Sequence, residues 1–171
     1  MKTIFFVVFI VLVGSCSTMS SKDKIAKALA FSDKFQYKKS IDLLTEVISD
    51  NDTCYDAYLF RAFAFEDIRN YQKALEDYNT LTELKDNDEF VYRRRASVYY
   101  MMGDYSSSLH NYQKALKIKP TNKELYNPIA HMLYITGEKE EACKYYQMAL
   151  INDDTTFNSE IVDYCRSKSF H

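Results

Sequence analysis

A single repeat spacing runs through most of the chain and constrains its fold more than any other feature. Tyr37, Tyr71 and Tyr105 stand 34 positions apart, and the next step of the same length falls on Lys139. A fixed period of this length is typical of repeat proteins, in which each repeat is one supersecondary unit that packs on its neighbours. The chain is therefore expected to consist of stacked repeats.

Windows of this length that start at Ser21, Tyr55, Glu89 and Lys123 bring further positions into register without insertion or deletion. A small residue recurs where two antiparallel helices would approach most closely, and a large ring recurs where neighbouring hairpins leave space to fill. Apolar residues three positions apart, such as Ala28 and Phe31, define one helical face. The columns are Ala28, Ala62, Ala96 and Ala130; Phe31, Phe65, Tyr99 and Leu133; Ser40, Ala74, Ser108 and Ala142; Leu44, Tyr78, Tyr112 and Tyr146; and Val47, Leu81, Ala115 and Ala149.

Turn signals divide each window into two helices. In the segment MMGDY, Gly103 can take the left-handed conformation at a helix end and Asp104 can cap the next helix. Gly137 is expected to do the same in ITGEK, whereas the second window has Arg69 followed by Asn70 and no glycine.

Glycine and proline are scarce, with 3 and 2 residues respectively, so the chain offers few tight turns and favours helices joined by short connections. Pro128 falls inside the first helix expected for the fourth window. Either Asn127 caps a late start with Pro128 in the first turn, or the helix is kinked.

The segments EDIRNYQKALEDYNTL and YMMGDYSSSLHNYQKALKIKP closely resemble the second half of the tetratricopeptide repeat. The resemblance implies an all-α solenoid of four helix-turn-helix hairpins in residues 21–156, with repeats at 21–54, 55–88, 89–122 and 123–156. Residues 157–171 lack a partner helix and are expected to form a capping helix. In the first window, Lys24 and Lys27 replace expected apolar residues, which fits a terminal repeat with a solvated outer face.

The first residues differ from everything that follows. Lys2 precedes an uninterrupted apolar run from Ile4 to Val13, which as a helix would span only about 15 Å, half of the bilayer core. A short positive start and a short apolar run followed by small residues indicate a secretory signal peptide in residues 1–15. Residues 16–21 would then be a polar tether.

The segment Val13-Gly14-Ser15-Cys16 resembles the lipobox of bacterial lipoproteins. That resemblance implies cleavage before Cys16 and attachment of acyl chains such as palmitate to it, which suffice for a stable membrane anchor. Ser17 after the cysteine implies the outer membrane, with the protein facing the periplasm. The alternative is an ordinary signal peptide whose cleavage site contains a cysteine by coincidence.

Several charged residues are expected to stabilise the hairpins. Arg61 and Arg95 occupy one repeat column and would face Asp77 and Asn111 of the second helices. A partly buried Arg61–Asp77 pair could fix the register of its hairpin. The three arginines of residues 93–95 point 100° apart on a helix and are not expected to form one patch.

By the resemblance, the first helices of the repeats line a concave groove that binds a segment of another protein. Apolar side chains in this groove are of interest because the core does not require them, although they could instead pack against neighbouring hairpins. The predicted partner-binding residues are Leu59, Phe63, Glu66, Arg93, Ser97, Tyr100, His131 and Tyr134.

Three cysteines remain besides the expected lipidation site, and an odd number cannot form a closed disulfide set. Cys143 in the last repeat and Cys165 in the capping helix could lie close together, but buried free thiols are the preferred interpretation for them and for Cys54. No Cys/His spacing indicates zinc, and no cofactor or other metal is expected.

The sequence therefore predicts an adaptor of the cell envelope, not an enzyme. It contains no P-loop, nucleophile elbow, HExxH motif or glycine-rich nucleotide loop. The formal charge of -2 disfavours nucleic acid as a partner, and no small-molecule substrate is indicated. The alternatives are a self-associating structural lipoprotein and an enzyme with an unrecognised site.

Overall fold

The computed structural model describes residues 19–152 and 159–168. The predicted signal peptide, Cys16, and residues 157–158 and 169–171 of the predicted capping segment lie outside these residues. The chain forms α1 (Ser21–Ser32), α2 (Tyr37–Asp50), α3 (Tyr55–Asp67), α4 (Tyr71–Leu84), α5 (Glu89–Met101), α6 (Tyr105–Ile118), the 3-10 turn η1 (Lys123–Leu125), α7 (Tyr126–Thr136), α8 (Lys139–Leu150) and α9 (Ser159–Lys168).

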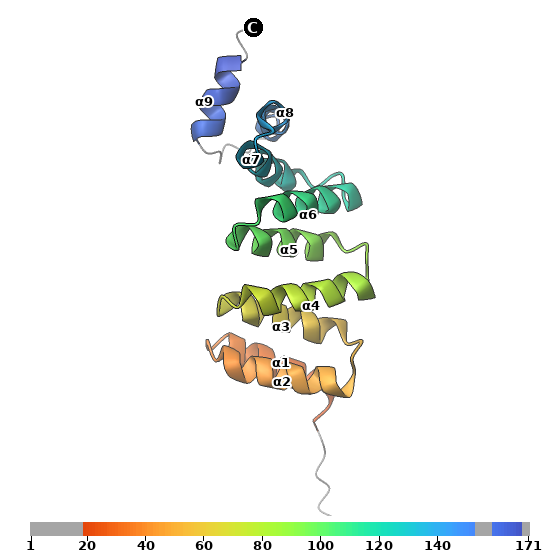
Figure 1. Cartoon of the computed structure of the whole chain (residues 1–171). Helices are drawn as coiled ribbons and strands as arrows, with labels where there is room; N and C mark the ends of the chain where they lie inside the picture. Colours follow the sequence, from red (N-terminus) through yellow and green to blue (C-terminus); the bar gives the residue numbers. More distant parts are fainter. Residues whose placement is uncertain (1–18, 153–158, 169–171) are drawn as a thin grey trace, which may run out of the picture.

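The helices pair in sequence order into four hairpins that stack from α1/α2 to α7/α8, and α9 packs at the C-terminal end (Figure 1). The predicted all-α solenoid of four hairpins with a terminal helix is confirmed. Each hairpin contacts the next in the chain, so the long-range packing is between sequence neighbours, as expected for a repeat protein. Among the described residues, no helix combines the length and apolarity needed to cross a membrane.

The aligned columns form the interior. Ala28, Ala62, Ala96 and Ala130 are completely buried, which lets the two helices of each hairpin approach closely. Tyr78 is also completely buried and packs with Leu81 of α4 and with residues of α3 and α5. The ring thus fills the space between the second and third hairpins.

The turn inside each hairpin contains one residue with positive φ, and these residues recur at the same position of each repeat. The φ values are 57° at Phe35, 58° at Arg69, 79° at Gly103 and 97° at Gly137. The predicted left-handed glycines are confirmed. Asp104 also caps α6 as predicted, since its Oδ1 accepts from the Ser107 amide at 3.0 Å.

The start of the fourth repeat agrees with only part of the first alternative for Pro128. The 3-10 turn η1 leads directly into α7 at Tyr126, so Pro128 lies in the first turn of the helix. A proline there interrupts no intrahelical hydrogen bond. The residue before the helix is Leu125, not Asn127, so the predicted Asn127 cap is wrong.

The two repeated arginines make the predicted contacts. Arg61 donates to both carboxylate oxygens of Asp77, at 3.0 Å from Nε and 2.7 Å from Nη2, and to Thr45 of the preceding hairpin at 3.1 Å. Arg95 donates from Nε to Asn111 Oδ1 at 2.7 Å. Arg95 also contacts Asn79, which occupies the same repeat position as Thr45, at 3.0 Å. Each arginine therefore joins its own hairpin to the preceding one.

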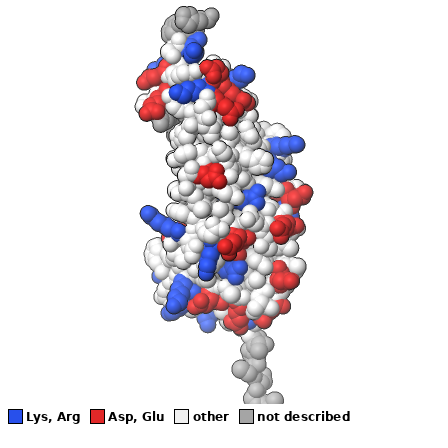
Figure 2. Space-filling model, viewed as in Figure 1, with Lys and Arg blue, Asp and Glu red and all other residues white. Residues whose placement is uncertain are grey.

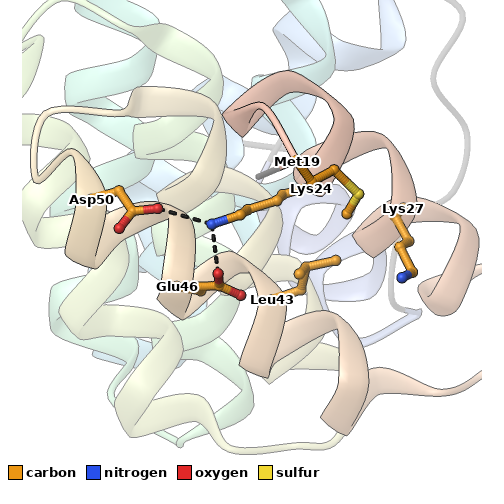
Figure 3. A pocket seen from close by; sticks show the side chains of 6 residues that line it. All are labelled: Met19, Lys24, Lys27, Leu43, Glu46 and Asp50. Atoms are coloured by element: carbon orange, nitrogen blue, oxygen red, sulfur yellow. Dashed lines mark hydrogen bonds and ion pairs between the residues drawn. The ribbon is translucent and has the colours of Figure 1, made fainter. Parts of the chain in front are cut away.

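The solvated outer face expected for the first repeat is wrong at Lys24. This side chain is buried, and its Nζ donates to Glu46 Oε1 at 2.6 Å and to Asp50 Oδ2 at 2.9 Å (Figure 3). These hydrogen bonds raise the pKa of Lys24 above its usual value. The lysine stem covers apolar surface, and its ammonium group is neutralised by α2. Lys27, by contrast, is exposed.

Replacing Arg69 by glycine should stabilise the protein by about 1 kcal/mol, because a left-handed backbone costs a non-glycine residue roughly 1–2 kcal/mol and glycine loses part of this gain through its greater freedom when unfolded. Denaturant unfolding measures the change. The reverse substitution, Gly103→Ala, should destabilise the protein by a similar amount. A Cβ there would meet no atom within 4 Å, so the cost comes from the backbone alone.

Removal of Arg61 should cost about 3 kcal/mol at pH 7, because it leaves the buried Asp77 carboxylate unpaired. Burial already raises the pKa of Asp77, with Arg61 opposing the rise. When the pKa of a carboxyl is higher in the folded than in the unfolded protein, the free energy of unfolding falls as pH rises through the folded pKa. Without Arg61 to oppose the effect of burial, this loss is larger, so Arg61→Ala should be least harmful at acidic pH. Urea unfolding from pH 7 to pH 4.5 tests this; an equal penalty at both pH values would contradict it. The double variant Arg61→Met/Asp77→Leu should recover most of the loss.

Candidate functional site

The eight predicted partner-binding residues lie on the first helices of the second, third and fourth hairpins. Leu59, Phe63 and Glu66 are on α3, Arg93, Ser97 and Tyr100 on α5, and His131 and Tyr134 on α7. We refer to these eight residues as the groove face. Their contacts differ widely, so the structure separates those that could meet a partner from those already used by the fold.

The side chains on α3 pack mainly against the adjacent hairpins. Leu59 and Phe63 are half-buried and lie against the core cluster of α3, α4 and α5. The ring of Phe63 contacts Phe60 at 6.2 Å and Phe90 at 6.0 Å between centroids, and the Arg94 guanidinium lies over it at 5.1 Å. Leu59 and Phe63 therefore serve hairpin packing and offer only part of their surface.

Glu66 is engaged inside the fold. Its carboxylate accepts a hydrogen bond from the Tyr78 hydroxyl and another, at 2.6 Å, from Arg94 Nη2. Burial, and secondly the charge of Glu66, raise the pKa of Tyr78 well above its usual value, so the phenol remains a proton donor. The triad joins α3, α4 and α5 and leaves Glu66 little capacity to bind a partner.

Arg93 and Ser97 share a cavity of about 210 Å³ between the third and fourth repeats. The Nε atoms of Arg93 and Arg94 are buried and make no hydrogen bond within the described residues. Arg93 Nε lies 3.5 Å from Glu89 Oε1, a long ion pair that does not satisfy this donor. The lining side chains are Arg93, Arg94, Ser97, Tyr112, Glu124, Leu125 and Pro128.

This cavity corrects one expectation from the sequence. Arg93 and Arg94 both line it, whereas Arg95 extends to α4 and α6, so only Arg95 is separated from the other two. The Arg93 side chain is 37% exposed, so its guanidinium could bind a carbonyl or carboxylate oxygen of a partner. Glu124 on the same wall would compete with an anionic group.

Tyr100 is the most exposed member of the groove face, with 37% of its surface accessible. Its ring contacts Tyr105 at 5.8 Å and His131 of the next repeat at 5.9 Å. Burial lowers the pKa of His131, which keeps the imidazole neutral at pH 7. The pair therefore presents an uncharged aromatic surface between the third and fourth hairpins.

Tyr134 is covered by the capping helix. The ring of Tyr164 on α9 packs edge-on against it at 5.9 Å, and Lys139 Nζ lies 4.8 Å from its centroid. Tyr164 also donates to Glu140 at 2.7 Å. Helix α9 therefore caps the last hairpin, as the sequence predicted, and it covers Tyr134 at the C-terminal end of the groove face.

A disulfide between Cys143 and Cys165 fixes α9 to α8. The preferred interpretation of these cysteines as free thiols is therefore wrong, although their proximity was foreseen. The capping helix also buries Ile161 against Ala130 and Tyr146. Cys54 is the one free cysteine in the described part of the chain.

Phe90 is a groove-side residue that the sequence did not identify. It is 36% exposed, contacts Phe63, and lies beneath the Arg93 guanidinium at 5.3 Å. Its repeat column holds lysine, aspartate and glutamate in the other windows, so the repeat pattern did not identify it.

Within the residues described, no group of three or more His, Cys, Asp or Glu side chains could hold a metal ion.

Comparison with known proteins supports the fold. The family model for the tetratricopeptide repeat matches residues 90–122, which form the third hairpin and its following turn. A crystal structure of MamA superposes with a TM-score of 0.73 at 22% identity and covers 78% of each chain. The protein has the tetratricopeptide-repeat fold.

Two further solved structures show the same likeness. A structure of MamA AMB-1 has a TM-score of 0.73 at 15% identity, over 88% of this chain and 82% of MamA. A MamA segment from Desulfovibrio magneticus RS-1 has a TM-score of 0.72 at 12% identity, over 81% and 78%. At these identities, the likeness to the MamA structures shows the shared tetratricopeptide-repeat fold alone. No curated protein matches the sequence.

Loss of the disulfide should destabilise the capped form of the solenoid by roughly 2–4 kcal/mol, because the bridge closes a loop between positions 22 residues apart. Thermal unfolding of the full chain with and without reductant measures this, and Cys143→Ser should reproduce the reduced curve. Cys54→Ser is the control and should leave the effect of reductant unchanged. Identical melting curves with and without reductant would contradict the role of the bridge.

Proposed function

We propose that this protein is a non-catalytic adaptor of the bacterial cell envelope that binds a segment of another protein along its groove face. The observation that carries the proposal is the exposure of aromatic and apolar side chains on consecutive first helices. Tyr100 of the groove face is 37% exposed, and two further apolar side chains on the same first helices, Phe90 on α5 and Ile135 on α7, are 36% and 40% exposed. The tetratricopeptide-repeat fold supports a protein–protein interaction scaffold.

The chemistry of the face favours a partner segment with an apolar anchor and an acidic side chain. Tyr100 and His131 offer a neutral aromatic surface for the anchor, and the partly exposed Arg93 lies on the same helix two turns before Tyr100. Aromatic and arginine side chains commonly dominate binding energy at interfaces. Glu66 and Tyr134 are assigned smaller roles because the fold already uses them.

The envelope location is proposed from the sequence, with support from the structure. The lipobox-like segment ending at Cys16 suggests a lipid-anchored protein, and Ser17 favours the outer membrane, facing the periplasm. The Cys143–Cys165 bridge is consistent with export because disulfides persist in oxidising compartments.

Site-specific photocrosslinking tests the groove face. A benzoylphenylalanine placed at Tyr100 in cells should crosslink to a discrete foreign protein, whereas the same group at the exposed His110 of α6 should not. Arg93→Gln should reduce the crosslink at position 100 by about tenfold, since an interfacial arginine is worth roughly 1–2 kcal/mol or more. Lys117→Glu, on α6, is the matched control. Crosslinking at position 110 alone, or only to a second copy, would favour another surface or the self-associating alternative.

Lipid attachment is tested separately. The protein should incorporate a metabolic acyl analogue and float with membranes, and Cys16→Ala should abolish both properties. Labelling that persists in the Cys16→Ala protein would refute the lipid anchor but not the adaptor function.

A further inference from the structure

A second exposed surface lies away from the groove face, at the turns inside the first two hairpins. Phe35 is 80% exposed and Ile68 is 46% exposed, and the two side chains line one shallow cavity of about 350 Å³. Exposed lysine and arginine side chains surround them. We call this surface the turn patch; it consists of Lys34, Phe35, Lys38, Lys39, Ile68 and Arg69.

Packing inside the fold does not account for Phe35. Its backbone is left-handed, with φ of 57°, at the position where the third and fourth repeats carry glycine. A bulky side chain is disfavoured there, and most of this ring faces solvent. Its edge-on contact with Tyr37, at 6.2 Å, orients the ring without burying it. The turn therefore presents a large aromatic group outward at a conformational cost.

The charge of the turns changes sign along the solenoid. Residues 33–39 contain three lysines and one aspartate, and residues 67–73 contain one arginine, one lysine and one aspartate. The matching windows are acidic: residues 101–107 have one aspartate, and residues 135–141 have three glutamates and one lysine. Basic side chains project along the lower left edge of the molecule, at the height of the first two hairpins (Figure 2).

We propose that the turn patch contacts a membrane surface that contains anionic lipids. A protruding aromatic ring flanked by lysines suits a flat interface, where the ring enters the boundary between headgroups and acyl chains and the ammonium groups meet lipid phosphates. An extended protein segment would be better held by a concave surface with convergent donors, such as the Arg93 cavity. The turns of the first two hairpins carry more basic than acidic side chains, so their charge is complementary to that of anionic lipid headgroups.

The patch lies on the first hairpin, which follows the predicted anchor in the chain, at the opposite end of α1 from Ser21 (Figure 1). Helix α1 starts at Ser21, a few residues after Cys16, so a lipid at that cysteine would keep the first hairpin close to the bilayer. Such tethering raises the effective concentration of a weak contact. This orienting effect rests on the anchor in the proposed function, whereas the affinity of the patch itself does not.

The full chain contains no tryptophan, so Phe35→Trp places a single reporter in the patch. Phosphatidylcholine vesicles containing about 30% phosphatidylglycerol should shift its emission to the blue, and brominated lipids should quench it. Pure phosphatidylcholine vesicles and about 0.5 M salt should largely prevent both effects, because the attraction is electrostatic. Tyr105→Trp is the matched control: it lies in the acidic third turn beside exposed Met101 and Met102 and should show neither effect.

Charge variants in the Phe35→Trp background give the decisive comparison. Lys34→Glu/Lys38→Glu should raise the lipid concentration that gives half of the full emission shift by about thirtyfold. This follows because each basic residue near an anionic membrane contributes about 1 kcal/mol to binding. Lys34→Arg/Lys38→Arg should behave like the parent. Circular dichroism spectra that match the parent would show that the variants are folded.

The outcomes separate the patch from the anchor. Flotation with pure phosphatidylcholine vesicles reports the anchor, and the phosphatidylglycerol-dependent shift of the tryptophan at position 35 reports the patch. Flotation without the shift overturns the patch alone, and the shift without flotation overturns the anchor alone. A shift produced by soluble polyglutamate but not by vesicles would identify an acidic protein as the partner and overturn the lipid assignment.

Discussion

The close approach of paired helices at a small side chain sets the geometry on which the other contacts depend. Ala62 and Ala96 are fully buried where their hairpins close, and any larger residue would push the helices apart. Because the same approach recurs in every repeat, successive hairpins stack with similar geometry. Large rings such as Tyr78 can then fill the remaining space between hairpins, and the second-helix carboxylate of Asp77 comes within reach of Arg61.

Polar side chains determine how rigidly adjacent hairpins are joined. Arg61 binds both its own hairpin and Thr45 of the preceding one, and Arg95 repeats this arrangement one window later. The contact of Glu66 with Tyr78 and Arg94 adds a further link between the second and third hairpins. Buried polar groups of this kind are stable only when their hydrogen bonds are satisfied. The centre of the solenoid is thus a rigid support for the surfaces beside it.

The surfaces available for binding are the parts of the repeat that this framework does not use. On the first helices these are the aromatic surface at Tyr100 and the donors around Arg93. At the first turns, Phe35 projects with its basic neighbours. The two surfaces use different elements of the hairpins, so the protein could contact a membrane through its turns while its first helices hold a partner. The capping helix limits the groove face at Tyr134.

The sequence by itself determined the repeat length, the helical hairpins and the left-handed turn at Gly103, because helix periodicity, small-residue columns and caps depend on residues close in the chain. It also predicted the Arg61–Asp77 pair, because both residues lie in the same hairpin, on its first and second helix. Only the tertiary structure decided that Glu66 is used internally and that Cys143 is bridged, because Arg94 reaches Glu66 from the next hairpin and Cys165 lies on the capping helix. The burial of Lys24 was also decided by the tertiary structure, although its partners lie within its own hairpin, because two carboxylates of α2 converge on its ammonium group only once the hairpin has closed.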